Sequence, residues 1–131
     1  MYINEDGFEE VDGREKQIMN YTLNIKGRLL SLEHPQVMGI LNCTPDSFFA
    51  GSRKQSEAEI AERANQIAAE GGTIIDVGAF STRPGAQEVS EEEEMARLRR
   101  ALPVVKREQP DMAVSVDTYR PDVARIVVEE Y

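Results

Sequence analysis

Three short apolar runs lie in the last two thirds or so of the chain. They are residues 37–41, 73–77 and 113–116, and each gives way to polar or turn-forming residues. Runs this short and this apolar are typical of strands buried on both faces of a parallel sheet. We therefore predict three parallel strands at these positions.

The segment between the first two runs has helical periodicity. Residues 56–70 carry apolar side chains at helical spacing, and the pair Ser56 and Glu59 has the spacing of a capping box. Gly71-Gly72 follows as a stop signal, since glycine readily adopts the left-handed conformation that ends a helix. This segment predicts a helix that connects two strands.

The remaining segments repeat this arrangement. A second capping pair, Ser90 and Glu93, predicts the start of another helix with an apolar face. We expect Pro103 to break or restart this helix, because proline fits best in the first turn of a helix. A third helix is predicted to open near Pro121. The glutamates at 91–94 are interpreted as a solvated first helical turn that interacts with the helix dipole, not as a metal site. Strand starts recur about every 35 to 40 residues, which is typical of βα units and predicts an α/β fold.

Apolar and polar residues alternate ahead of the first run. Residues 21–25 and 30–32 show this alternation, and Lys26-Gly27-Arg28 can turn the chain between them. The pattern predicts a small antiparallel hairpin. If the sheet belongs to a barrel, such a hairpin would close its amino-terminal mouth and serve stability.

Composition limits the classes of function. The 131 residues, 40% of them hydrophobic, are interpreted as a single domain, 1–131. The net charge of -9, from 15 basic and 24 acidic residues, argues against a nucleic-acid partner. No stretch approaches the roughly 20 apolar residues of a membrane span, and residues 1–17 resemble no targeting segment. We therefore expect a cytoplasmic protein without a membrane partner. The single cysteine, Cys43, excludes an internal disulfide, and one histidine excludes a Cys/His zinc site.

Polar loops follow the predicted strands. The sequence NCTPDSF occupies residues 42–48, GAFSTRPG occupies residues 78–85, and Asp117-Thr118 ends the third strand. Loops at the carboxyl ends of buried parallel strands are where α/β enzymes place their chemistry. Candidate functional residues are therefore expected there.

Four motifs in these regions resemble a known family. They are MGILNCTPDSF at 38–48, IIDVG at 74–78, STRPG at 81–85 and SVDT at 115–118. In this order and at these separations the motifs closely resemble dihydropteroate synthase, over roughly residues 21–131. The resemblance implies the amino-terminal portion of a (β/α)8 TIM barrel, with about three of its eight βα units. It also implies a homodimeric transferase that uses Mg2+ in folate biosynthesis. This enzyme condenses 6-hydroxymethyl-7,8-dihydropterin diphosphate with 4-aminobenzoate to give 7,8-dihydropteroate and diphosphate, and sulfonamides compete with the aminobenzoate.

The resemblance also implies roles for residues at two strand ends and within one strand. Asn42 resembles the ligand of the metal and the diphosphate, although an asparagine that caps the strand end is the structural alternative. Asp117 resembles the pterin-binding aspartate, with capping of the next helix as its alternative. Asp76 would support the pterin indirectly, or it would serve the structure alone.

Further roles fall in the two loops. Ser81, Thr82 and Arg83 resemble the residues that contact the pterin diphosphate and build part of the aminobenzoate site, with Thr82 and Arg83 as the catalytic pair. The planar guanidinium of Arg83 suits diphosphate or a carboxylate. Phe48 and Pro84 would form apolar walls for the aminobenzoate ring.

The chain departs from the family pattern in two loops and in length. Ala50 stands where an acidic residue is common, and Ala79-Phe80 replaces the usual small-plus-acidic pair. A complete barrel of this type needs about 250 residues, so we expect the 131 residues alone to be inactive. Two alternatives are a pterin-binding domain of a methyltetrahydrofolate corrinoid methyltransferase and an inactive truncated remnant. The motifs at 44–48 and 81–85 favour the synthase.

Overall fold

The computed structural model describes residues 8–11, 14–17, 21–43, 53–80 and 88–131. The chain divides into two compact units, Met1–Pro35 and Gln36–Tyr131. The interpretation of residues 1–131 as one domain stays a prediction.

The first unit contains two antiparallel hairpins. Strand β3 (Thr22–Ile25) pairs with β4 (Arg28–Ser31), which confirms the hairpin predicted from the alternating pattern. Lys26 and Gly27 form its two-residue loop with φ values of 51° and 79°, as a type I′ turn requires. The Gly27 N–H donates to Asn24 Oδ1 at 3.0 Å.

The other hairpin was not predicted from the sequence. It consists of β1 (Phe8–Val11) and β2 (Arg14–Gln17). Its strands are short and mostly polar, so no apolar run marks them.

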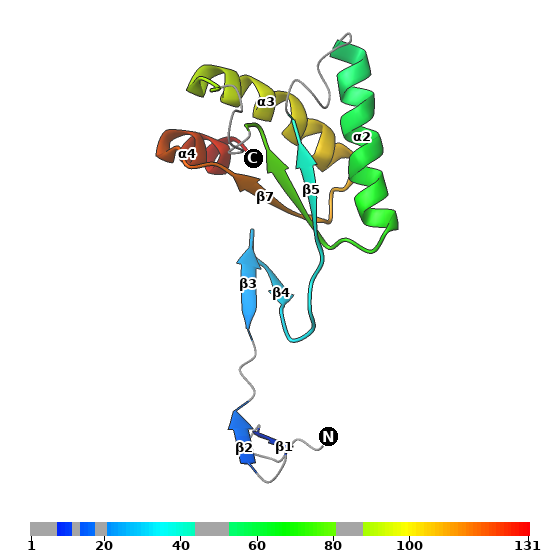
Figure 1. The fold of residues 1–131 in the computed structure, drawn as a ribbon, viewed down its shortest axis with the longest axis vertical. Helices are drawn as coiled ribbons and strands as arrows, with labels where there is room; N and C mark the ends of the chain where they lie inside the picture. The colour runs from blue at the N-terminus through cyan, green and yellow to red at the C-terminus, as the bar shows by residue number, and fades with distance from the viewer. Residues whose placement is uncertain (1–7, 12–13, 18–20, 44–52, 81–87) are drawn as a thin grey trace. The chain divides into compact units, whose positions relative to one another are not determined.

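The second unit is an α/β layer with a three-stranded parallel sheet (Figure 1). Its strands are β5 (Met38–Asn42), β6 (Ile74–Gly78) and β7 (Ala113–Asp117), in the order β5-β6-β7. The three apolar runs therefore predicted the strands to within one residue at each end. This sheet confirms the α/β fold class.

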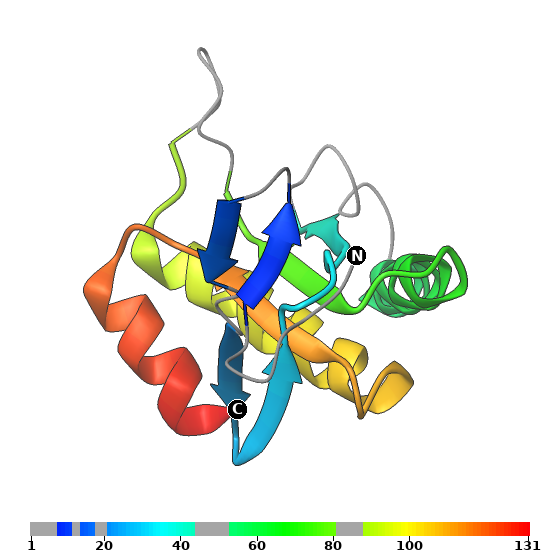
Figure 2. The same ribbon diagram turned by 90° about the horizontal axis from the view of Figure 1, so that it is seen from below.

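Three helices in the described part of the chain accompany the sheet. They are α2 (Arg53–Ala69), α3 (Glu91–Glu108) and α4 (Pro121–Glu130). Helix α3 lies between α2 and α4 in both ribbon views (Figures 1 and 2), and it contacts both of them. No described helix is long and apolar enough to span a membrane.

The helices pack against one face of the sheet. Leu41, Ile75 and Val77 are fully buried and join the helical side chains in a single core cluster. Side chains alternate along a strand, so Met38 and Ile40 point to the opposite face, where they are 49% and 56% exposed. The sheet therefore has one covered face and one face that the described helices leave open.

Helix α2 ends as predicted but begins earlier. Gly71 has φ +91°, and the N–H groups of Gly71 and Gly72 donate to the carbonyls of Ala68 and Ile67 at 3.1 and 2.8 Å. These bonds form a Schellman motif. The predicted start was wrong, because the helix already begins at Arg53 and Ser56 lies buried inside it. The pair Ser56 and Glu59 therefore lies within the helix and does not mark its start.

Helix α3 confirms one prediction and corrects two others. Ser90 is the N-cap, and its side chain accepts from the Glu93 N–H at 3.2 Å. The helix continues through Pro103 without a break. Pro103 is exposed, so water can satisfy the carbonyl that lacks a helical donor. Glu91, Glu92 and Glu93 are exposed in the first turn of α3, in agreement with the interpretation of the run as solvated. Glu94 is fully buried and departs from it, because it pairs with Arg120.

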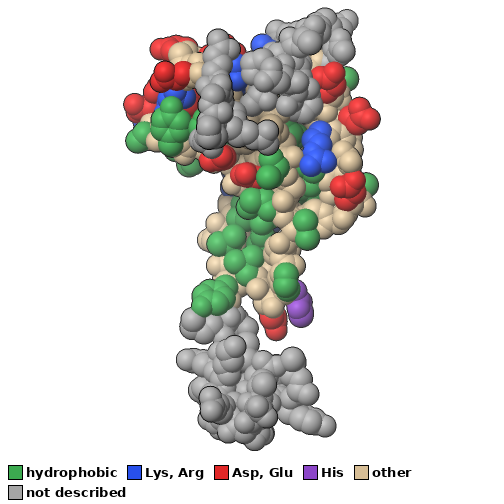
Figure 3. All heavy atoms as spheres, viewed as in Figure 1, with side chains coloured by type: hydrophobic (Ala, Val, Ile, Leu, Met, Phe, Trp, Pro, Cys, Tyr) green, Lys and Arg blue, Asp and Glu red, His purple; other side chains and the backbone are tan. Residues whose placement is uncertain are grey.

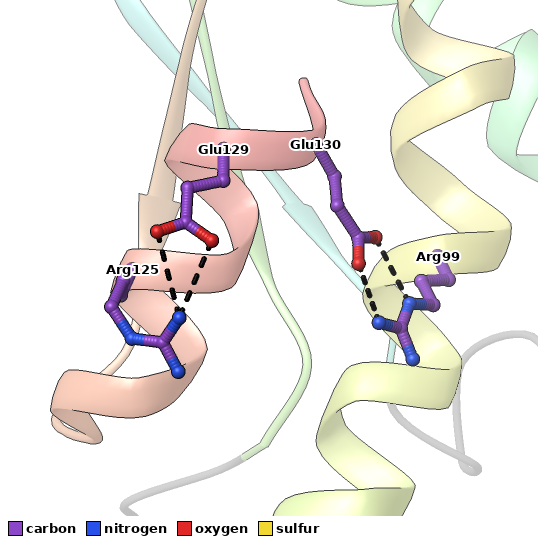
Figure 4. A network of polar contacts seen from close by, with 4 residues as sticks. All are labelled: Arg99, Arg125, Glu129 and Glu130. Carbon is purple, nitrogen blue, oxygen red and sulfur yellow. Dashed lines mark hydrogen bonds and ion pairs between the residues drawn. The ribbon is translucent and has the colours of Figure 1, made fainter.

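Charged side chains lie on the exposed surfaces of the helices. In Figure 3 the acidic side chains gather over α2 on one side and over α3 and α4 on the other. Figure 4 shows two of the ion pairs, Arg99 with Glu130 between α3 and α4, and Arg125 with Glu129 within α4. Both pairs are exposed, so each contributes little to stability.

Candidate active site at the carboxyl ends of the sheet

The last residues of the three strands are aligned across the sheet. Asn42 is the pairing partner of Gly78, and Gly78 is the pairing partner of Asp117. Neighbouring strands lie about 4.8 Å apart, so the backbones of Asn42 and Asp117 flank Gly78 with roughly 10 Å between them. Both flanking residues are exposed. The parallel register thus brings together two residues that the sequence analysis assigned to metal and pterin.

Gly78 leaves space between these two residues. A Cβ atom added at this position would lie 3.2 Å from Asn42 Oδ1, the one heavy atom of the described residues that it meets within 4 Å apart from its chain neighbours. The amide oxygen of Asn42 therefore reaches over the middle strand. No side chain on β6 separates Asn42 from Asp117 at this level.

Asp76 lies on the same face of the sheet, one row below. Ile40, Asp76 and Ser115 are paired across the three strands, two residues before Asn42, Gly78 and Asp117. Alternation places both rows on the face that the helices do not cover. Asp76 and Ser115 are partly buried. The open face is therefore polar at its carboxyl end, and Asp76 lies where it could support a ligand held above it.

The structure excludes the capping alternative for Asp117. Helix α4 has Arg120 as its N-cap, without a side-chain cap hydrogen bond, and Pro121 at its start. This start confirms the prediction that a helix opens near Pro121. Asp117 belongs to the strand and does not cap the helix.

Six of the residues singled out in the loops lie outside the described residues. They are Phe48, Ala50, Ser81, Thr82, Arg83 and Pro84. Their predicted roles stay predictions.

Cys43 follows Asn42 and turns into the core. Its N–H donates to the Gly78 carbonyl at 2.7 Å, and its side chain is fully buried. Burial raises the pKa of the Cys43 thiol to about 12, although the charges of Arg97 and Arg100 act in the opposite direction. The thiol is therefore protonated at neutral pH, and it is not a nucleophile.

Two arginines, which the sequence analysis missed, lie behind this edge of the sheet. Arg97 donates to Glu93 Oε1 at 2.8 Å and to the Ala79 carbonyl at 2.9 Å. Arg120 donates to Glu94 Oε2 and, at 2.5 Å, to the Val89 carbonyl. The only feature of the local sequence that pointed to either arginine was the i,i+4 spacing of Glu93 and Arg97, and such pairs are common on solvated helices.

Phe80 also has a partner that the sequence could not reveal. Its ring packs edge to face against Tyr119, with the centroids 5.0 Å apart and an interplanar angle of 88°. The Arg120 guanidinium carbon lies 4.8 Å from the centroid of the Tyr119 ring. The departure from the family pattern at residue 80 is thus an aromatic contact between the segments that follow β6 and β7.

The described residues offer no complete metal cage. Among them, no group of three or more His, Cys, Asp or Glu side chains could hold a metal ion. Asn42 supplies one exposed amide oxygen at the edge of the sheet. This arrangement suits a hard cation that keeps several waters and binds substrate phosphates, as Mg2+ does.

Comparison with known proteins identifies the family. The family model described as pterin binding enzyme matches residues 38–131. The chain therefore belongs to the pterin-binding enzymes.

Within this family the chain is similar to dihydropteroate synthases. It is 50% identical to that of Escherichia coli (strain K12) over 102 residues, which are 76% of this chain and 35% of the relative. The Xanthomonas albilineans enzyme, solved with 4-aminobenzoic acid, superposes with a TM-score of 0.69 and 43% identity, over 85% of this chain and 40% of that one. The Anaplasma phagocytophilum enzyme, solved with 6-hydroxymethylpterin-monophosphate, gives a TM-score of 0.64 and 34% identity, over 72% and 36%. The chain thus spans about a third of the length of its curated relative.

Proposed function

We propose that this chain forms the first three βα units of a dihydropteroate synthase barrel. Met38 and Ile40 expose apolar side chains on the sheet face opposite the helices. Strands β5 and β7 each pair with β6 alone among the described strands. Further strands at both edges would close a barrel, cover these side chains and satisfy the free backbone groups.

The reaction we propose joins 6-hydroxymethyl-7,8-dihydropterin diphosphate to 4-aminobenzoate and releases diphosphate. The observation that carries this proposal is the alignment of Asn42 and Asp117 on either side of Gly78, at the carboxyl edge of a parallel sheet. Active sites of barrel enzymes lie at this edge. The relatives named above are synthases, which supports this function over that of a corrinoid methyltransferase domain.

Asp117 is proposed to bind the pterin. Its carboxylate can accept hydrogen bonds from two adjacent N–H groups on the 2-amino-pyrimidinone edge of the ring. Such charge-assisted bonds are directional and strong. Asp76, one row below on the neighbouring strand, is proposed to support the ring indirectly.

Asn42 is proposed to hold Mg2+ together with the diphosphate of the substrate. When bound, Mg2+ neutralises the negative charge that develops on the departing diphosphate. Asn42 contributes a neutral oxygen, and its position beside Gly78 keeps that oxygen at the edge of the sheet. The residue thus orients the leaving group relative to the pterin at Asp117.

The two loops are proposed to complete the site. Thr82 and Arg83 would bind the diphosphate and the aminobenzoate, Ser81 would contact the substrate, and Phe48 and Pro84 would enclose the aminobenzoate ring. Arg83 suits this role because its planar guanidinium pairs with phosphate or carboxylate oxygens. The homodimeric state and the cytoplasmic location stay predictions.

The test uses the protein at the full length that its gene encodes. Incubation with Mg2+, the pterin diphosphate and 4-aminobenzoate should give 7,8-dihydropteroate, detected by mass, and a sulfonamide should compete with the aminobenzoate. The 131 residues alone should give no product, because their matched part covers only 35% of the E. coli relative. Absence of product from the full-length protein would overturn the proposed function.

A further inference from the structure

Two backbone carbonyls that flank the loop after β6, those of Ala79 and Val89, each accept a hydrogen bond from an arginine. Arg97 binds the Ala79 carbonyl, and Arg120 binds the Val89 carbonyl. Each arginine also pairs with one of two consecutive glutamates in the first turn of α3, Arg97 with Glu93 and Arg120 with Glu94. Both carbonyls are therefore linked to the same turn of α3.

The environment of Arg120 restrains its side chain. Only 15% of the side chain is exposed, and that of its partner Glu94 is fully buried. Glu94 Oε1 has no hydrogen-bond partner among the described residues. Burying a carboxylate is costly unless a cation compensates it, so the ion pair with Arg120 offsets part of the cost of burying Glu94.

Aromatic contacts add a second connection. The Arg120 guanidinium lies over the Tyr119 ring, and Tyr119 packs edge to face on Phe80, the residue that follows Ala79. Cation–π and aromatic pairs each favour one arrangement of the groups involved. Residues that follow β7 therefore contact both ends of the segment that follows β6: Phe80 through Tyr119, and Val89 through Arg120.

We propose that Arg120 is a positioning residue that fixes Val89 directly and Phe80 through Tyr119, the two described ends of the loop after β6, relative to Asp117. Asp117 is only three residues before Arg120, and its backbone is fixed in the sheet beside Gly78. One short segment thus holds the carboxylate proposed to bind pterin and contacts Phe80 and Val89, which flank the stretch of sequence that contains Thr82 and Arg83. The anchoring contacts are independent of ligand, whereas their consequence for catalysis rests on the proposed function.

This arrangement predicts a specific kinetic defect. Misplacing groups by about 1 Å can cost on the order of a hundredfold in rate. Loss of the anchor should therefore raise the KM for 4-aminobenzoate and lower kcat, by tenfold or more. Binding of a pterin without diphosphate should change less than twofold, because Asp117 stays in its strand.

The first test is hydrogen exchange, measured by mass spectrometry on the full-length protein. In Arg120→Lys the charge remains for Glu94, but one ammonium cannot reproduce the fork that reaches both Glu94 and Val89. Peptides covering residues 80–92 should then exchange on the order of tenfold faster, with those covering residues 38–43 unchanged. Arg125→Lys is the matched control, because Arg125 lies in α4, the helix that Arg120 precedes, and forms exposed ion pairs with Asp122 and Glu129; Figure 4 shows the pair with Glu129. Exchange at residues 80–92 equal to that of the wild type would overturn the proposal.

The second test separates this proposal from the proposed function. If the wild-type protein forms no dihydropteroate, the proposed function fails, and hydrogen exchange alone decides whether Arg120 anchors the loop. If it is active, Arg120→Lys should show the raised KM for aminobenzoate together with unchanged pterin affinity, and Arg125→Lys should match the wild type. Unchanged kinetics in Arg120→Lys, or an equal loss of pterin affinity, would contradict the positioning role.

Discussion

Asn42 lies directly beside Gly78, and its Oδ1 is 3.2 Å from the point that a Cβ atom on Gly78 would occupy. Strand β6 thus carries no side chain at residue 78, the position over which the Asn42 amide of β5 extends toward β7. This relationship joins the geometry of the sheet to the proposed chemistry, because any side chain at residue 78 changes where the Asn42 oxygen lies.

Gly78→Ala should therefore impair catalysis more than folding. Among the described residues the added methyl group meets only the end of a flexible side chain, so Asn42 must move by a few tenths of an ångström. We expect kcat/KM to fall on the order of tenfold, with a loss of less than about 1 kcal/mol in the free energy of unfolding. Steady-state kinetics and urea unfolding measure the two effects. A fully active variant would show that the space beside Asn42 is not needed.

Gly39→Ala should have the opposite profile. A Cβ atom there would lie 2.4, 2.7 and 3.0 Å from the Cγ2, Cγ1 and Cδ1 atoms of Ile67 in α2. Overpacking of this kind typically costs about 1 to 3 kcal/mol of stability. Because Ile67→Ala removes these atoms, the double variant should lose less stability than the sum of the two single changes. Strict additivity in urea unfolding would contradict the close contact between α2 and β5.

Local signals predicted much of this fold. The apolar runs at 37–41, 73–77 and 113–116 marked β5, β6 and β7, since polar or turn residues follow each run. Pro103 misled the prediction, because the penalty for proline inside a helix depends on whether the freed carbonyl faces water. That exposure is a property of the folded structure and not of the local sequence.

The candidate site was predictable in part. The motif resemblance pointed to Asn42 and Asp117, but their alignment across Gly78 depends on pairing between strands distant in the sequence. The arginine anchors were missed for a similar reason. Arg97 and Arg120 bind carbonyls 18 and 31 residues away along the chain, at a distance no local pattern covers.

Cys43 should be unreactive in the folded protein. Its thiol is fully buried and has a pKa of about 12, compared with 9.0 for an unperturbed cysteine. Iodoacetamide should therefore label the peptide containing Cys43 slowly at pH 8, and much faster in denaturant. Equal labelling rates in both conditions would show that the thiol is accessible.

The same thiol should make stability depend on pH in the alkaline range. The unfolded state loses the thiol proton near pH 9 and the folded state near pH 12. The contribution of the protonated thiol to the free energy of unfolding is therefore complete below pH 9 and decreases as the pH rises from 9 to 12. The total decrease is on the order of 4 kcal/mol, at about 1.36 kcal/mol per unit of pKa difference. Urea unfolding at pH 8 to 11 should give a weaker pH dependence for Cys43→Ala. An identical dependence would contradict the raised pKa.

Calorimetric titration of the full-length protein with a pterin that lacks the diphosphate tests the central claim most directly. Asp117→Asn should weaken binding on the order of 2 to 3 kcal/mol, because a charge-assisted pair is lost. Asn42→Ala should bind this ligand like the wild type, since Asn42 is assigned to Mg2+ and diphosphate. Asp122→Asn, an exposed site on α4, is the matched control and should also leave binding unchanged. Equal affinities of the wild type and Asp117→Asn would remove Asp117 from the pterin site and contradict the account.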